Sequence, residues 1–185
     1  LARSAQNSRG RRQPRRGGES GHAAAYYLRC VGGTDLLCPS LVIRDEEQQW
    51  LEAYGLQQGW DVRSRILVLH PGSGGKKKRW APEGFARVAH WWASRRNTKV
   101  LILLGPAEEH EAASWRLVGQ VESALSVWQA AALFSRADVY VGNDSGASHL
   151  AGAVGARGVV LFGPTQPQQW RPLGGALSVL RNLRY

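Results

Sequence analysis

The stretch Val139-Tyr-Val-Gly-Asn-Asp-Ser-Gly-Ala-Ser-His-Leu150 predicts a buried strand, a turn of small residues and the first turns of a helix. This order directs the free N–H groups of the helix N-terminus at one point, together with the positive end of the helix dipole. A phosphate or another anion is the expected occupant of that point. The turn carries one carboxylate, Asp144, which would also serve as a plain helix cap.

A second glycine-rich turn, His70-Pro-Gly-Ser-Gly-Gly-Lys-Lys-Lys-Arg-Trp80, also follows an apolar run and precedes a helical pattern. Its glycines allow a phosphate to approach the backbone, and its lysines supply positive charge. It is not a Walker phosphate loop, and the chain has no Gly-x-Gly-x-x-Gly after a strand. Taken alone, this turn is equally well interpreted as a solvated basic loop. Together the two turns predict a diphosphate held between them.

Apolar runs and helical patterns alternate along most of the chain. Strands are expected at residues 65–69, 99–104, 138–141, 158–162 and 177–180, with another short strand at 41–43. Helices are expected at residues 23–31, 45–56, 82–92, 108–118, 126–135 and 145–154. This alternation predicts an α/β fold with a Rossmann-like parallel sheet and helices on both faces. Ligands of such sheets bind beyond the carboxyl ends of the strands, where both glycine-rich turns fall.

Length and composition are those of one globular domain with a core of its own. The chain has 185 residues, 43% of them hydrophobic, and no apolar run approaches the roughly 20 residues of a membrane span. It shows no signal-peptide pattern, and Cys30 and Cys38 are expected to be reduced thiols of a cytoplasmic protein. Because the chain begins with Leu1 and contains no methionine, we expect it to be a piece of a longer protein.

The net charge of +10 is concentrated toward the N-terminus. Residues 1–21 contain six arginines and one glutamate and lack apolar periodicity, which predicts a disordered basic segment followed by one domain over residues 22–185. Two interpretations of this segment stay open. It is either a tether to nucleic acid or an anionic membrane, or a linker without a binding role.

Several short motifs occur in order along the chain. They are His70-Pro-Gly-Ser-Gly74, Lys78-Arg79-Trp80, Pro82, Phe85, Gly105-Pro106 with Glu109, Arg136-Ala-Asp138, Gly142-Asn-Asp-Ser-Gly146 with His149, and Leu161-Phe-Gly-Pro-Thr165 with Trp170. By the order and separation of these motifs, the chain resembles, from residue 22 to about residue 180, the C-terminal half of the family 9 glycosyltransferases, the lipopolysaccharide heptosyltransferases.

The resemblance implies a GT-B enzyme, in which two Rossmann-like domains face a cleft. The C-terminal domain would hold the nucleotide sugar, typically ADP-heptose, as a substrate, and the N-terminal domain would hold the lipopolysaccharide core acceptor. The acceptor domain is absent from this chain, so we expect the chain to bind donor weakly and to transfer nothing. Transfer would invert the anomeric centre, at the cytoplasmic face of the inner membrane and in peripheral contact with it.

Matched position by position, the resemblance also implies a site. Ser73 and Gly74 would cradle phosphate, Lys78 would pair with the diphosphate, and Glu109 would bind the ribose hydroxyls. Ser145 and Gly146 would present amides to the diphosphate, while Asp144 and His149 would lie near the transferred sugar. The catalytic residues would then be Lys78, Asp144 and His149.

Three further expectations follow. The chain has no Asp-x-Asp pair, so we predict no metal requirement and no cofactor. Glu122-Ser-Ala-Leu-Ser126 replaces a segment in which the family commonly has a glycine, and this leaves the preference for adenine open.

The basic runs are not interleaved with aromatic residues, which disfavours the alternative of a nucleic-acid-binding module. An inactive, non-binding fragment is a third alternative.

Overall fold

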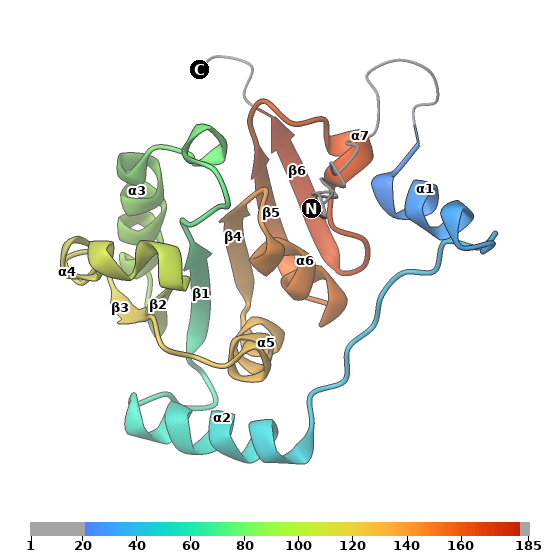
Figure 1. Cartoon of the computed structure of the whole chain (residues 1–185). Helices are drawn as coiled ribbons and strands as arrows, with labels where there is room; N and C mark the ends of the chain where they lie inside the picture. The colour runs from blue at the N-terminus through green and yellow to red at the C-terminus, as the bar shows by residue number, and fades with distance from the viewer. Residues whose placement is uncertain (1–20, 182–185) are drawn as a thin grey trace, which may run out of the picture.

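The computed structural model describes residues 21–181, so the predicted disordered segment, apart from Gly21, lies outside the described residues. Six parallel strands form one sheet in the order β3-β2-β1-β4-β5-β6 (Figure 1). Their bounds are β1 Arg65–His70, β2 Thr98–Leu103, β3 Gln120–Glu122, β4 Val139–Asn143, β5 Arg157–Phe162 and β6 Ala176–Arg181. The chain order reverses between β1 and β4, and this is where open α/β sheets bind their ligands.

Helices cover both faces of the sheet, which confirms the predicted Rossmann-like fold (Figure 1). They are α1 Ala23–Cys30, α2 Asp45–Gln57, α3 Pro82–Ala93, α4 Ala112–Trp115, α5 Val127–Arg136, α6 Gly146–Ala153 and α7 Pro167–Trp170, with 3₁₀ turns η1 Lys76–Lys78 and η2 Pro106–Glu111. Side chains of α3 and α4 form one core with the sheet, and those of α2, α5 and α6 form another on the opposite face. Within residues 21–181, none of the helices has the length and apolar character to span a bilayer.

Strand β1 contributes to both cores, which explains the apolar run Ile66-Leu-Val-Leu69 within it. Ile66 and Val68 pack with α2, α5 and α6, whereas Leu67 and Leu69 pack with α3 and α4. Successive side chains of a strand point to opposite faces, so a strand covered on both sides needs apolar residues at every position. The continuous run at 65–69 therefore predicts the central strand correctly.

Two helices, α3 and α5, begin with recognisable local signals. Pro82 occupies the first turn of α3, where its fixed backbone angle fits and its missing N–H is not needed. Ser126 and Gln129 form a capping box at the start of α5, in which each side chain accepts a hydrogen bond from the other residue's backbone N–H. These signals fix both helix starts within a residue of their predicted positions.

Two sequence predictions are wrong. Residues 41–43 form no strand, because the N–H of Leu41 donates to the carbonyl of Ala153 at the end of α6 (2.8 Å) and the segment pairs with no strand of the sheet. The helix expected over 108–118 is replaced by the 3₁₀ turn η2 followed by the single α-helical turn α4. The sequence analysis also missed β3, a three-residue strand with polar residues at both ends, and α7.

Gly158 is expected to be the glycine on which the β4–β5 pairing most depends. Its φ is +153°, and an added Cβ would lie 1.8 Å from the carbonyl oxygen of Tyr140 on the neighbouring strand. We expect Gly158→Ala to lower the free energy of unfolding by about 3 kcal/mol or more, measured by urea denaturation. Gly21→Ala is the matched control, because no heavy atom lies within 4 Å of its added Cβ. An equally small effect of both substitutions would contradict this account of the sheet.

Candidate functional site

The two glycine-rich turns lie side by side where β1 and β4 end. The hydroxyl of Ser73 donates to the backbone carbonyl of Asp144 at 2.8 Å. The side-chain amide of Asn143, which is fully buried, donates to the carbonyl of Pro71 at 2.8 Å and accepts from the N–H of Trp80 at 2.9 Å. One side chain of the β4 turn thus holds both ends of the β1 loop.

Asp144 is the centre of charge at this edge. Its side chain is 6% exposed, and its Oδ2 lies 2.8 Å from the Nζ of Lys78 and accepts a hydrogen bond from the hydroxyl of Thr165 at 2.7 Å. Burial of a carboxylate is tolerated where a cation and hydrogen-bond donors compensate it. Asp144 precedes Ser145, the N-cap of α6, so it is not the cap of that helix. Its side chain instead joins the loops that follow β1, β4 and β5.

The N-terminus of α6 faces this rim without a side-chain cap. Ser145 occupies the cap position, but its hydroxyl makes no capping hydrogen bond, and its Oγ is buried with no partner among the described residues. Gly146 begins the helix and has open space where a side chain would stand. Helix N–H groups that lack a capping oxygen are donors for an anion.

His149 lies within electrostatic reach of the same charges. Its side chain is exposed, yet desolvation by its neighbours lowers the pKa of the imidazole, and the Asp144 carboxylate opposes this shift. Electrostatic interactions with His22 and Lys78 lower the pKa further. His149 is therefore neutral at pH 7 and able to accept a hydrogen bond.

A second set of contacts ties the β1 loop to η2. Arg79 forms a two-pronged ion pair with Glu111, with N–O distances of 2.8 and 2.5 Å, and its Nε donates to the carbonyl of Pro71 at 3.3 Å. The carboxylate of Glu108 is buried against Gly72 and accepts from the N–H of Ser73 at 3.3 Å. These contacts fix the loop from the side opposite to Asn143.

A cavity of about 620 Å³ opens beside these loops, between the ends of β1, β2 and β3 and the first turns of α5 and α6. Its lining includes His70, Leu103, Glu122, Leu125, Phe134 and Leu150. A mainly apolar cavity with a few polar groups is the usual form of a small-molecule site. The cavity adjoins the reversal of strand order through His70, which ends β1, and through α6, which follows β4, and this agrees with that interpretation.

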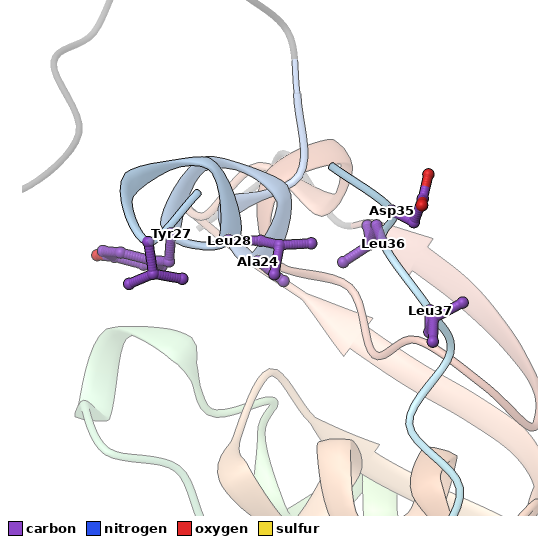
Figure 2. Close-up of a pocket in the computed structure, with 7 residues that line it drawn as sticks. Ala24, Tyr27, Leu28, Asp35, Leu36 and Leu37 are labelled. Atoms are coloured by element: carbon purple, nitrogen blue, oxygen red, sulfur yellow. The ribbon is translucent and has the colours of Figure 1, made fainter. Parts of the chain in front are cut away.

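Another pocket of about 620 Å³ lies between α1 and the segment that follows it (Figure 2). Its lining includes Ala24, Tyr27, Leu28, Asp35, Leu36 and Leu37. Asp35 is the single charged side chain drawn there, and it points away from the apolar side chains (Figure 2). This pocket gathers no set of polar groups that would orient a ligand, so we do not assign it as the functional site.

The structure brings most of the predicted site residues to one rim. These are Ser73, Gly74, Lys78, Asp144, Ser145, Gly146 and His149, all on the loops after β1 and β4 or the start of α6. Glu109 also follows β2 at this edge, but it is exposed, whereas its neighbour Glu108 is the carboxylate that faces the β1 loop. The functions of these residues in binding and catalysis stay predictions.

Sequence reasoning missed Asn143, Glu108 and the hydroxyl of Thr165 as parts of the site. The position of Asn143 at the end of a buried strand was the available signal, because a polar residue there needs hydrogen-bond partners. The structure also shows that two cations of the run 76–79 are engaged by carboxylates, Lys78 by Asp144 and Arg79 by Glu111. The basic run is therefore not a uniformly solvated surface.

Comparisons with known proteins find a matching family and similar solved structures. A family model described as glycosyltransferase family 9 (heptosyltransferase) matches residues 39–185. The structure is similar to that of a family 9 glycosyl transferase from Veillonella parvula DSM 2008, with a TM-score of 0.78 and 24% identity over 90% of this chain and 51% of that protein. The comparison with curated proteins gives no match.

Two E. coli structures are also similar. ADP-heptose LPS heptosyltransferase II has a TM-score of 0.68 and 22% identity over 82% of this chain and 47% of that protein. Heptosyltransferase WaaC with ADP has a TM-score of 0.57 and 20% identity over 84% of this chain and 47% of that protein. The chain thus spans about half the length of these solved structures.

The Arg79–Glu111 pair predicts a pH-dependent contribution to stability. The hydrogen bonds from Arg79 lower the pKa of Glu111, so the stabilisation is complete above the ordinary carboxyl pKa and is lost as the pH falls through the lowered value. We expect Glu111→Gln to lower the free energy of unfolding by about 1 kcal/mol at pH 7, and this difference to shrink at acidic pH. Urea denaturation across this pH range measures it.

Glu46→Gln is the control for this experiment, because Glu46 is 85% exposed and lies 4.0 Å from Arg44. We expect that substitution to leave the free energy of unfolding nearly unchanged at every pH. A Glu111→Gln difference that does not vary with pH would show that packing rather than charge carries the effect.

Proposed function

The chain belongs to glycosyltransferase family 9, and on that premise we propose that it is the nucleotide-sugar-binding half of a heptosyltransferase that uses ADP-heptose. The observation that carries the proposal is the convergence of Lys78, the start of α6 and the β1 loop at one edge beside a cavity of about 620 Å³. That arrangement offers a cation and backbone N–H groups for a diphosphate, with space for a nucleoside beside them.

The diphosphate is proposed to lie between the β1 loop and α6. Gly74, Gly75 and Gly146 have open space where a side chain would stand, so a phosphate can approach their backbone closely. Ser73 uses its N–H and hydroxyl to join neighbouring loops, and this supports a function in shaping the phosphate cradle. Lys78 is 35% exposed, which leaves its ammonium accessible to a ligand while it contacts Asp144.

The reaction proposed is displacement at the anomeric carbon with inversion. The oxygen of an acceptor hydroxyl forms a bond to that carbon, and the bond from the carbon to the diphosphate oxygen breaks with its electron pair staying on the diphosphate. Lys78 and the α6 N-terminus would stabilise the negative charge that develops there. Asp144 and the neutral His149 would hold hydroxyl groups of the transferred sugar. The base that takes the proton of the acceptor hydroxyl is expected on the acceptor-binding half of the enzyme.

We propose that this reaction needs no metal ion. A divalent metal in a glycosyltransferase neutralises the diphosphate, and here a lysine and a helix N-terminus lie where that task would fall. Asp144 is an acidic residue on the rim, and its carboxylate is already compensated by Lys78 and Thr165. Among the described residues, Asp144 does not belong to any group of three or more acidic, histidine or cysteine side chains that could hold a divalent metal ion.

The donor and acceptor complete the proposal. The similar E. coli structures include one named for ADP-heptose and one determined with ADP, which supports an adenine nucleotide as the donor. A lipopolysaccharide core acceptor would bind on the other half of the enzyme, at the cytoplasmic face of the membrane. The alternative of a nucleic-acid-binding module gains no support, because Lys78 and Arg79 are engaged by carboxylates.

We expect the 185-residue chain to bind ADP in a calorimetric titration and to bind AMP more weakly, because AMP lacks the second phosphate. Lys78→Ala should weaken ADP binding about tenfold or more and AMP binding less, since a charge-assisted contact to the diphosphate is lost. Lys77→Ala, an exposed neighbour in the same turn, is the matched control and should bind ADP like the unchanged chain. Equal losses in both variants, or no ADP binding, would contradict the proposed site.

Metal independence has its own test. We expect the affinity for ADP to agree within about twofold in EDTA and in magnesium chloride, because the protein cation rather than a metal contacts the diphosphate. Titrations in the two buffers, corrected for the binding of magnesium to free ADP, measure this. A large gain in affinity on adding magnesium would overturn the proposal that Lys78 and the helix N-terminus suffice.

A further inference from the structure

The fold determines which ring nitrogen of His70, a side chain of the cavity, carries the proton. His70 is the last residue of β1, is 9% exposed, and its Nδ1 lies 2.9 Å from the backbone carbonyl of Leu103. A carbonyl oxygen can only accept, so the proton of this hydrogen bond lies on Nδ1. In a neutral imidazole the other nitrogen, Nε2, then carries a lone pair and is a hydrogen-bond acceptor.

The surroundings keep this imidazole neutral. Burial lowers the pKa of His70, the hydrogen bond to Leu103 and the charge of Glu108 oppose this shift, and the charge of Arg79 adds to it. Glu122 is a further carboxylate on the cavity wall. The net direction is downward, so the neutral form, with its accepting Nε2, dominates at pH 7.

Nε2 is also available to a ligand. His70 lies on the same face of β1 as Ile66 and Val68, the face covered by α5 and α6, and these helices form part of the cavity wall. Nε2 has no hydrogen-bond partner among the described residues. In that part of the chain, the fully buried side-chain atoms without a partner are Trp60 Nε1 and Ser145 Oγ. Because Nε2 of His70 is not one of them, it is not fully buried. The acceptor is therefore reachable from the cavity that His70 lines.

Two other polar side chains of the cavity, Glu122 and Ser126, make hydrogen bonds within the protein. The Oε1 of Glu122 accepts from the hydroxyl of Tyr54 at 2.8 Å and from the side chain of Gln120 at 3.2 Å. The hydroxyl of Ser126 accepts from the N–H of Gln129 at 3.1 Å in the capping box. In contrast to these two oxygens, the Nε2 of His70 accepts no hydrogen bond from the described residues.

We propose that His70 is a specificity residue of the nucleoside cavity, and that its Nε2 accepts a hydrogen bond from a neutral O–H or N–H group of the donor nucleoside. This inference rests on the proposed function, because it takes the cavity to be the nucleoside site. Two parts of an adenine nucleotide present such groups, the ribose hydroxyls and the exocyclic amine of the base. A ligand that offers only acceptors at this point would leave two lone pairs facing each other.

Two substitutions separate the accepting nitrogen from the rest of the side chain. In His70→Asn, the amide can still donate to the carbonyl of Leu103 but the acceptor at the position of Nε2 is lost. In His70→Gln, the longer side chain can return an oxygen to that position. We expect His70→Asn to weaken ADP and AMP binding about 3- to 10-fold, the range for one neutral hydrogen bond, and His70→Gln to recover part of this loss.

Modified nucleotides identify the group that is bound and exclude a purely structural effect. The ligands are 2′-deoxy-ADP and 3′-deoxy-ADP, which each lack one ribose hydroxyl, and inosine diphosphate, which lacks the exocyclic amine. The analogue without the recognised group should bind the unchanged chain more weakly, and His70→Asn should weaken its binding no further. An equal loss for ADP and all three analogues would mean that His70 only supports the fold, and this would overturn the inference.

The pH dependence gives a second readout. As the pH falls through the lowered pKa of His70, Nε2 becomes a donor and ADP affinity should fall more steeply in the unchanged chain than in His70→Asn. Parallel pH profiles would contradict the inference, because Glu108, Glu122 and the phosphates are present in both experiments and only His70 differs. If the unchanged chain does not bind ADP at all, the proposed function fails. If it binds and His70→Asn binds equally well, only the present inference fails.

Discussion

The buried amide of Asn143 is the constraint on which the candidate site depends. Its Nδ2 donates to the carbonyl of Pro71 and its Oδ1 accepts from the N–H of Trp80, so the same planar group binds the entry and the exit of the β1 loop. An aspartate would lack the donor and a leucine would lack both functions. Because Asn143 is fully buried, an unpaired partner would be costly, and the loop is held in one conformation. The residues between the two contacts, Ser73 to Lys78, are thereby placed opposite α6.

The charge of the Asp144 carboxylate is compensated before any ligand arrives. Asp144 is compensated by Lys78 and Thr165, and this combination keeps a carboxylate stable at 6% exposure. A diphosphate that binds beside Lys78 would compete with Asp144 for the ammonium, while the hydroxyl of Thr165 would continue to hold the carboxylate. On the proposed function, the protein would exchange one anionic partner of Lys78 for another, which requires less rearrangement than assembling a site from solvated side chains.

Sequence patterns predicted the elements that are determined by residues close together in the chain. The apolar runs of β1, β2 and β5 and the small-residue turns predicted the sheet and its carboxyl edge, since each depends on neighbours in the chain. The carboxylate that faces the β1 loop could not be chosen in this way. Residues three apart align along one side of a 3₁₀ turn, so Glu108 and Glu111 share the side that meets the loop and Glu109 does not. The sequence alone does not say which side of this turn meets the loop, because the contact joins Glu108 to Ser73, a residue of another segment.

The two faces of the sheet stabilise different parts of the candidate site, and β1 connects them. The core with α3 and α4 supports η2 and the Arg79–Glu111 pair, which fix the β1 loop from one side. The core with α5 and α6 supports the cavity, where Phe134 belongs to both the core and the lining. His70 ends β1 between these regions, with its Nδ1 bound to the neighbouring strand and its ring on the cavity wall. A change in the packing of either face would therefore alter one part of the site, whereas a shift of β1 would displace the phosphate loop and the cavity acceptor together.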